Sequence, residues 1–314
     1  MDIYKLTNDG VDKIKANPFA LEKDIQLLVE ENLEQLFNLQ MVTSEFRISN
    51  YRFDTLAFDE ESSSFVIVEY KKGHSYSVID QGYTYLATML GNKAEVVLEY
   101  NEKLGRSLRR DDVDWSSSRV IFVSPSFNSY QKDSVNFKDV PFELWEIKRY
   151  SDDTIILDPH KSTSGDSIEA LGETNKAITA VASEVKVWQE SDHLNGMTEK
   201  TLTNWQLIKD HFDGLEGVSY NVRSPYISIV KGSVAVCFVH FRKAGLRIDV
   251  IRGGKSADGS LSKGYFNIDD PKGLALQHTR PWKDGERHQY VIEVEDDVNL
   301  DEILELLMQK FHSL

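Results

Sequence analysis

Two acidic residues and a lysine in the first quarter of the chain have a spacing that could support metal-dependent chemistry. Asp54 is followed, after fourteen residues, by Glu69, Tyr70 and Lys71. Side chains alternate between the two faces of a strand, so Glu69 and Lys71 share one face and Tyr70 lies on the other. Carboxylates bind hard divalent cations and an ammonium group binds phosphate oxygens. This set of residues is therefore suited to hydrolysis of a phosphodiester bond.

The surrounding pattern predicts that these residues lie on paired strands. Residues 44–58 mostly alternate between polar and apolar side chains, and residues 65–71 form a second, more apolar run. Between them the polar sequence DEESSS favours a turn. We therefore expect a β-hairpin, or two adjacent strands, with residues 44–58 as the first strand.

The shortest turn sets the register of this hairpin. If Asp59 pairs with Ser64, then Asp54 lies opposite Glu69. Directly opposed carboxylates are about 5 Å apart and repel each other. Apolar residues fill the rest of this face, which disfavours a solvated strand. The sequence therefore predicts that Asp54 and Glu69 bind Mg²⁺, which takes one or two protein carboxylates. Lys71 could hold a phosphate oxygen, orient a water or stabilise developing charge.

The stretch 53–73 resembles the core of the PD-(D/E)XK nuclease superfamily, most closely its RecB-like and NucS-like branches. Asp54, Glu69 and Lys71 match the Asp, the second acid and the Lys of the motif, and Phe53 stands where the motif name has proline. The resemblance covers about residues 20–150. It implies a restriction-endonuclease-like fold, dependence on Mg²⁺ with Mn²⁺ as a substitute, and DNA as the substrate.

Two further features extend the resemblance. Gln81 and Tyr85 match the QxxxY motif of RecB-like nucleases, and on a helix they face the same side. The resemblance implies that they hold the site and the DNA backbone. It also implies an acidic residue from the first helix. We expect this residue to be Glu30, beside the apolar stripe, with Glu34 as the second choice; Glu22 and Glu31 complete the set.

The periodicity of the N-terminal half predicts an α/β (α+β) core, in which a central mixed β-sheet is flanked by helices. Apolar residues recur at helical spacing in the first helix, which supports an amphipathic helix. The expected helices span residues 21–39, 77–90 and 94–105, and the further strands span 118–125, 141–150 and 154–158.

A polar stretch without an apolar pattern begins at residue 158. We therefore divide the chain into a nuclease-like domain at 1–157, a linker at 158–190 and a smaller α+β domain at 191–314. The last of these resembles an uncharacterised bacterial domain sometimes labelled "predicted transport protein", in the stretches KAGLRIDV and IDDPKGLA. No apolar run in it is long enough to support that label.

The C-terminal domain could serve in substrate recognition. Its pattern predicts helices at 201–212 and 300–311, the second capped by Asn299, and strands at 226–230, 234–241, 245–253 and 289–295. Five polar-tipped residues near strand ends could line a surface for stacking and phosphate contacts, but we assign no binding site to them. They are Arg223, Tyr226, Arg280, Trp282 and His288.

The net charge of the chain limits how it can bind nucleic acid. The formal net charge is −15, which excludes a protein that coats nucleic acid through bulk charge. A nuclease must then rely on bound cations and a local basic patch. The candidates near the hairpin are Arg47, Arg52, Lys72 and His74, with Arg52 expected opposite Lys71; we assign His74 no role of its own.

No basic-then-apolar leader opens the chain, no run approaches the roughly 20 apolar residues of a membrane span, and there is one cysteine. These features indicate a cytoplasmic protein. The expected function is a Mg²⁺-dependent endonuclease that hydrolyses DNA, in restriction or phage defence. The expected partner is DNA and not a membrane, and a homodimer is left open. The alternatives are a nucleic-acid-binding protein that keeps the fold without turnover, and a subunit that is active only with a partner chain.

Overall fold

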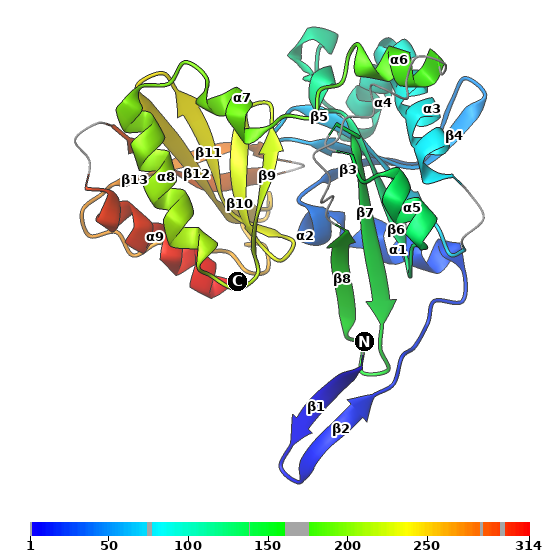
Figure 1. Ribbon diagram of the computed structural model, residues 1–314, viewed down its shortest axis with the longest axis horizontal. Coiled ribbons are helices and arrows are strands. Elements are labelled where there is room, and N and C mark those ends of the chain that lie inside the picture. Colours follow the sequence, from blue (N-terminus) through cyan, green and yellow to red (C-terminus); the bar gives the residue numbers. More distant parts are fainter. Residues whose placement is uncertain (1, 74–76, 138, 161–175, 283–284, 296–298) are drawn as a thin grey trace. The chain divides into compact units, whose positions relative to one another are not determined.

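The computed structural model describes residues 2–73, 77–137, 139–160, 176–282, 285–295 and 299–314. The chain forms two compact units, Met1–Val187 and Trp188–Leu314, each with its own β-sheet (Figure 1). The fold is mixed α and β, as the alternation of helical and strand patterns predicted. Among the described residues, no helix combines the length and the apolar character needed to cross a membrane.

The boundary between the units differs from the expected one. Strand β8 (Ile155–His160) crosses the end predicted at residue 157. Helix α6 (Lys176–Ala182) lies in the segment expected as linker, yet Val181 is 1% exposed in the core of the first unit. The helix packs there because its apolar residues recur at helical spacing. This pattern is short and follows a polar segment, so the sequence analysis did not recognise it. The linker assigned to 158–190 is therefore wrong from residue 176 to 187, and residues 161–175 lie outside the described ranges.

The sheet of the first unit is mixed, as predicted. Its strand order is β3-β4-β5-β6-β7-β8. The neighbours β5, β6 and β7 run parallel to one another, and the other neighbouring pairs are antiparallel. The parallel strands end at one edge of the sheet, which is the position where α/β proteins place their ligand sites. The strands not yet bounded are β3 (Gln40–Ile48), β4 (Tyr51–Asp59), β5 (Ser64–Tyr70), β6 (Arg119–Ser124) and β7 (Phe142–Arg149).

Helices cover both faces of this sheet (Figure 1). On one face, Val29 packs in a core with Val66 and Val68. On the other, Leu86 packs in a core with Ile67. The first face carries α1 (Glu22–Glu31) and α2 (Leu33–Phe37); the second carries α3 (Val78–Gly91) and α4 (Lys93–Leu104). Short helices α5 (Ser129–Ser134), η1 (Arg110–Asp112) and η2 (Trp115–Ser117) complete the unit.

Two elements predicted as continuous are divided. The helix expected at 21–39 breaks at Asn32, whose side-chain amide donates to the carbonyl of Leu28 and so competes with the helical backbone. The strand expected at 44–58 is two strands, because a turn at Ser49 and Asn50 reverses the chain. Ser49 has a φ of 54°, a conformation that ends a strand.

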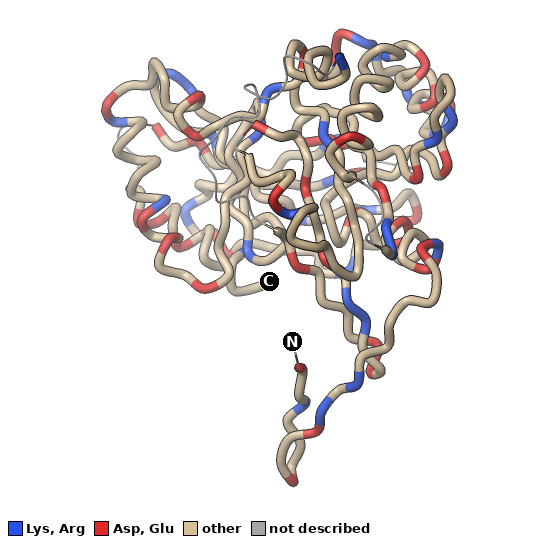
Figure 2. The backbone as a smooth tube through the Cα atoms, turned by 45° about the vertical axis from the view of Figure 1, so that its right-hand side comes forward, with Lys and Arg blue, Asp and Glu red and all other residues tan. Residues whose placement is uncertain are grey.

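An N-terminal hairpin that the sequence analysis did not predict extends away from the rest of the first unit (Figures 1 and 2). Its strands are β1 (Ile3–Thr7) and β2 (Gly10–Ile14), and nearly all of their residues are exposed. Beyond β2, Ala16 bridges to Tyr150 and so joins the hairpin to the end of β7. The sequence NDG at residues 8–10 is a turn signal that could have indicated it.

The second unit is an antiparallel sheet with two helices on one core. Its strand order is β13-β14-β12-β11-β10-β9. The capping role predicted for Asn299 is confirmed, since its side chain accepts from the N–H of Asp301. The two strands that were not predicted, β9 (Val218–Arg223) and β13 (Ala275–Trp282), are the sheet edges, where polar sequences are common. The other elements are β10 (Tyr226–Lys231), β11 (Val234–Arg242), β12 (Gly245–Lys255), β14 (Gly285–Val294), α7 (Glu190–Leu194), α8 (Glu199–Asp213) and α9 (Leu300–Ser313).

A glycine fixes how closely α3 approaches the sheet. A Cβ atom added to Gly82 would lie 2.6 Å from ring atoms of Phe142, whereas one added to Gly91 would meet nothing within 4 Å. We expect Gly82→Ala to lower the free energy of unfolding by about 1–3 kcal/mol. Gly91→Ala should be neutral or slightly stabilising, because alanine is the better helix former. Urea denaturation of both variants checks this, and equal stabilities would contradict the proposed close contact.

Candidate active site

The hairpin of β4 and β5 has the register predicted from the sequence. Asp59 pairs with Ser64 and Leu56 pairs with Ile67. The main-chain ladder of this pair of strands ends at Thr55. The residues that the sequence analysis singled out lie just beyond this last pair, where β4 begins and β5 ends.

Side chains continue the hydrogen bonding where the ladder stops. The N–H of Asp54 donates to Glu69 Oε1 at 3.0 Å, and the N–H of Tyr70 donates to Asp54 Oδ2 at 3.1 Å. Each carboxyl group is thus held by the neighbouring strand. Glu69 is 1% exposed. Glu69 is therefore fixed and buried and Asp54 is fixed and half-buried, which disfavours the alternative of a solvated strand face.

Lys71 is fixed at the same point by both its main chain and its side chain. Its N–H donates to the carbonyl of Val123, which extends the pairing of β5 with β6 by one residue. Its Nζ lies 3.2 Å from Glu69 Oε2, and its side chain is 12% exposed. The ammonium group is therefore oriented by Glu69 and remains partly open to solvent.

Helix α3 brings the two residues of the QxxxY match to this site. Gln81 Nε2 donates to Glu69 Oε2 and to the hydroxyl of Tyr85, both at 3.0 Å. The Tyr85 ring lies 5.0 Å from that of Phe53, between centroids. Gln81 thus holds one carboxylate oxygen, and Tyr85 orients Gln81. Five of the six predicted catalytic residues converge.

Burial and like charge make this site electrostatically unfavourable for two ionised carboxylates. Burial, together with the charge of Asp54, raises the pKa of Glu69 from 4.5 to about 8, although Lys71 opposes the shift. Burial also raises the pKa of Asp54 above its ordinary value, against the effect of the Tyr70 N–H and Lys71. A bound cation would relieve both effects.

A divalent cation fits this donor set. Asp54 and Glu69 offer hard carboxylate oxygens that hydrogen bonds hold close together, and burial disfavours their charged forms in the absence of a cation. Within the described ranges, no three or more His, Cys, Asp or Glu side chains converge on one point. Two carboxylates suffice for Mg²⁺, which keeps several waters in its coordination shell.

The helix acid predicted at Glu30 lies elsewhere. Its Oε1 accepts from Thr55 Oγ1 at 2.6 Å and from Gln26 Nε2 at 2.9 Å. Thr55 Oγ1 also lies 3.1 Å from the hydroxyl of Tyr70, which packs in the core on the α1 side of the sheet. Glu30 is thus bound on the α1 face of the sheet and not at the acidic pair, which corrects the prediction. Glu34, the second choice, lies on α2, beyond the break in the helix.

Gln26 connects α1 to the candidate site, and sequence reasoning missed it. This buried amide donates to Glu30 and also to the main-chain carbonyl of Asp54, the latter at 3.1 Å. Glu30 and Gln26 therefore support the start of β4 from behind. A glutamine on the apolar side of a helix was the available signal.

Glu22 is the α1 glutamate that reaches the end of β5. Its Oε2 accepts from the N–H of Lys72 at 3.0 Å. Besides burial, its negative charge is one of the effects that raise the pKa of Asp54. Of the α1 glutamates, Glu22 is thus the one whose charge acts on Asp54.

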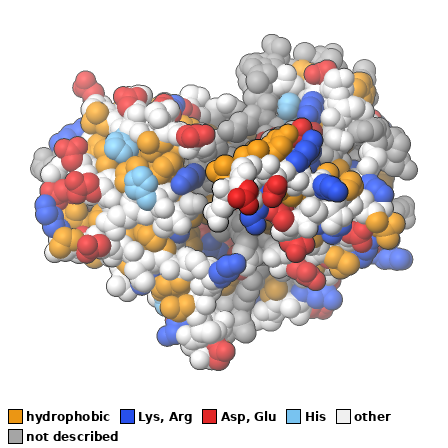
Figure 3. Space-filling view, turned by 90° about the horizontal axis from the view of Figure 1, so that it is seen from below, with side chains coloured by type: hydrophobic (Ala, Val, Ile, Leu, Met, Phe, Trp, Pro, Cys, Tyr) orange, Lys and Arg blue, Asp and Glu red, His pale blue; other side chains and the backbone are white. Residues whose placement is uncertain are grey.

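The expected basic patch is only partly present. Arg52 does not lie opposite Lys71; it pairs with Arg47 across the β3–β4 turn, and its Nε lies 2.9 Å from Glu45. The Lys72 ammonium donates to the carbonyl of Ala20. His74 lies outside the described residues. In the view of Figure 3, acidic and basic side chains are interspersed over the described surface.

The polar-tipped residues noted in the second unit do not form one cluster. The strand order places β9 and β10 at one side of the sheet and β13 and β14 at the other. The strand order thus separates these five residues into two groups. Arg223 and Tyr226 lie on the first pair of strands, and Arg280, Trp282 and His288 on the second.

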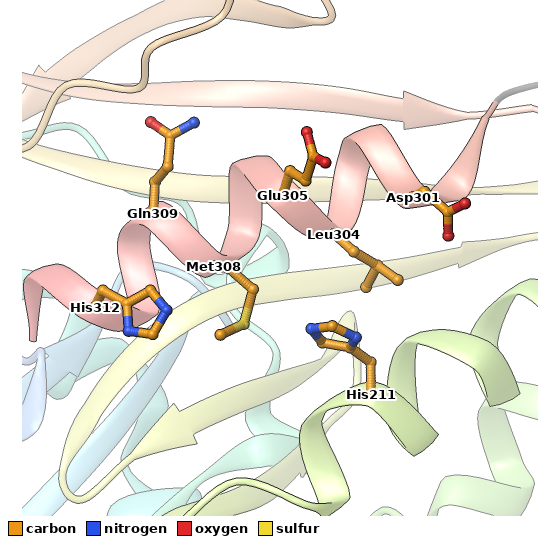
Figure 4. Close-up of a pocket in the computed structure, with 7 residues that line it drawn as sticks. All are labelled: His211, Asp301, Leu304, Glu305, Met308, Gln309 and His312. Carbon is orange, nitrogen blue, oxygen red and sulfur yellow. The ribbon is translucent and has the colours of Figure 1, made fainter.

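A groove of about 400 Å³ lies between α8 and α9 (Figure 4). Leu304 and Met308 give it an apolar lining, and His211 and His312 come from the two different helices. It offers no cluster of cations for a phosphate group. It therefore does not compete with the acidic pair as a site for phosphodiester chemistry.

No protein-family model matches the chain, and no solved structure matches it. An uncharacterised protein of Haemophilus influenzae is 39% identical over 316 residues, which cover 98% of this chain and 99% of the relative. The chain belongs to the same family as this protein. Because the match spans both units, the combination of the two units is a property of the family.

The raised pKa of Glu69 predicts how stability depends on pH. Between pH 4.5 and about 8, the folded protein keeps a proton that the unfolded chain releases. The free energy of unfolding should therefore fall as the pH rises through this window. Glu69→Gln lacks this titration. Between the low and the high end of the window, the melting temperature of the wild type should therefore fall by on the order of 5 °C more than that of the variant. Thermal unfolding in EDTA measures this, and parallel pH profiles would contradict it.

Proposed function

We propose that this protein is a Mg²⁺-dependent endonuclease that hydrolyses DNA phosphodiester bonds, with a first unit of the restriction-endonuclease-like type. The observation that carries the proposal is the hydrogen-bonded pair of the half-buried Asp54 and the buried Glu69, with Lys71 bonded to Glu69, at the carboxyl end of β5. A mixed sheet with helices on both faces agrees with that type of fold. A role in restriction or phage defence follows by analogy with the resemblance of the hairpin.

Each residue of the site has a distinct task in this reaction. Asp54 and Glu69 would hold Mg²⁺, which when bound supplies positive charge that activates water and offsets negative charge. Lys71 would donate hydrogen bonds to the phosphate oxygens as negative charge develops on them. Gln81 holds Glu69 Oε2, and the Tyr85 hydroxyl holds Gln81, so these two are positioning residues.

A second candidate is a nucleic-acid-binding protein without turnover. One observation favours it: the Glu69 carboxylate already accepts hydrogen bonds from Asp54, Lys71 and Gln81. A carboxylate satisfied in this way could be purely structural. A subunit that needs a partner chain would behave in the same way when purified alone.

A panel of substrates separates these functions. The purified protein is incubated with plasmid, single-stranded DNA and RNA, each with Mg²⁺, Mn²⁺ or EDTA. The proposal expects cleavage of DNA with either metal and none in EDTA. Retarded migration of intact DNA in every condition would identify the binding protein, and cleavage that appears only with cell extract would identify the subunit.

The two units could have separate roles, one in cleavage and one in target recognition. Contacts with phosphates carry no sequence information directly, so we assign target recognition to Trp188–Leu314. The observed boundary replaces the expected one, because a fragment ending at residue 157 would lose α6. We expect the fragment Met1–Val187 to cleave with Mg²⁺ but without the preference of the whole protein, and Trp188–Leu314 to be inert. Comparison of the digestion patterns tests this; an unchanged pattern from the first fragment would contradict it.

A further inference from the structure

A second group of charged residues lies on the same edge of the sheet as the acidic pair. The parallel register aligns Tyr70 with Val123, and Ser124 with Glu146. Lys71 therefore continues a row that runs through Ser124 to Glu146. Neighbouring strands are about 4.8 Å apart, so Glu146 stands about 10 Å from Lys71 across two strands.

Glu146 joins two lysines at this position. Its Oε1 lies 2.8 Å from Lys132 Nζ, and its Oε2 lies 3.1 Å from Lys148 Nζ. The N–H of Phe127 also donates to Oε1, at 3.2 Å. The Glu146 side chain is 13% exposed, while those of Lys132 and Lys148 are 33% and 37% exposed. One nearly buried carboxylate thus holds two ammonium groups that remain accessible to solvent.

These residues share the sheet face of the active site. Leu144 and Glu146 point to the same face of β7, and Leu144 packs in the same core as Ile67 on β5. Glu69 points to that face of β5 as well. A chain of phosphates that enters at Lys71 and runs across the carboxyl ends of β5, β6 and β7 would therefore pass Lys132 and Lys148.

The charge of the protein makes such a contact necessary. The net charge of −15 repels nucleic acid, and the Lys71 ammonium is occupied by Glu69. Each lysine that neutralises a phosphate adds a favourable release of counterions. Two lysines around one glutamate leave a local charge of +1 and ammonium hydrogens that can bind further acceptors.

We propose that Lys132 and Lys148, bridged by Glu146, bind the DNA backbone at a phosphate near the one that is cleaved. This inference rests on the proposed function and adds a second contact on the substrate. The recognised chemistry is a backbone phosphate of the same strand.

The test measures how DNA affinity depends on salt. Lys132→Ala and Lys148→Ala are each made in the Asp54→Asn protein, so that binding is measured on a 20-base-pair duplex without cleavage. Each substitution should weaken binding about tenfold at 0.1 M salt and reduce the slope of log affinity against log salt by about one. Lys132→Arg and Lys148→Arg keep the charge and should retain both values.

Lys103→Ala serves as the matched control, because Lys103 is an exposed lysine on α4 that is paired with Glu99. It should leave the salt slope unchanged. If the Lys132 and Lys148 variants match this control, the proposed contact is wrong while the proposed function stands. If the Asp54→Asn parent binds no DNA at low salt, the proposed function fails and this inference fails with it.

Discussion

Asp54→Asn and Glu69→Gln should each lower the rate of DNA cleavage by at least about 1,000-fold, while the protein stays folded. Each substitution removes one of the two carboxylates that we assign to the cation, and loss of a group that stabilises charge in a transition state costs about 10²–10³-fold by itself. Loss of the metal adds to this. The measurement is the single-turnover rate of plasmid cleavage in Mg²⁺.

Both variants should unfold at temperatures no lower than the wild type in EDTA. Each removes the repulsion that arises when both carboxyl groups are ionised, and the remaining carboxyl group should then ionise more readily. Glu31→Gln is the matched control, since Glu31 is an exposed carboxylate on α1. It should cleave at the wild-type rate. Full activity in either Asp54→Asn or Glu69→Gln would remove these residues from the mechanism.

Lys71→Ala should lower the single-turnover rate about 10²–10³-fold and change DNA affinity little. The Lys71 ammonium is held beside Glu69, so its contribution arises when charge develops on the phosphate. Lys72→Ala is the matched control, because the Lys72 ammonium bonds to the carbonyl of Ala20. It should retain the rate. A Lys71→Ala protein that cleaves normally but binds weakly would reduce Lys71 to a phosphate contact.

The hairpin was predictable because its signals are local. The alternation of side chains has a period of two, and a short polar turn allows one register that buries both Leu56 and Ile67. This register alone brings Asp54 and Glu69 together. The match of Gln81 and Tyr85 depends only on helical spacing, and the structure places both at the site.

The helix acid was not predictable in the same way. Four glutamates lie on the first helical segment, and the choice depends on the direction in which that segment crosses the sheet. The pattern of apolar residues favours Glu30, which faces the sheet but meets Thr55 and Gln26. Glu22 reaches the end of β5 because the first turn of α1 lies beside Lys72, a contact 50 residues apart in the sequence.

The edge strands of the second unit and helix α6, near the end of the first unit, were not predicted for a related reason. Edge strands such as β13 are polar, and they are held by the neighbouring strand instead of by an apolar pattern of their own. Helix α6 is short, and Val181 is buried only because it packs on a core formed by residues distant in the sequence. Tertiary packing determines whether such elements form, and this packing is hard to predict from a single sequence.

The most direct test of the nuclease assignment is metal depletion and restoration on the intact protein. Supercoiled plasmid is incubated with wild-type protein that has been treated with EDTA and dialysed, and Mg²⁺ is then added in steps. The account predicts no cleavage before addition, nicked and linear products that increase with Mg²⁺, and no products from Asp54→Asn at any concentration. Cleavage that persists in EDTA, or plasmid that stays intact with both Mg²⁺ and Mn²⁺, would contradict it.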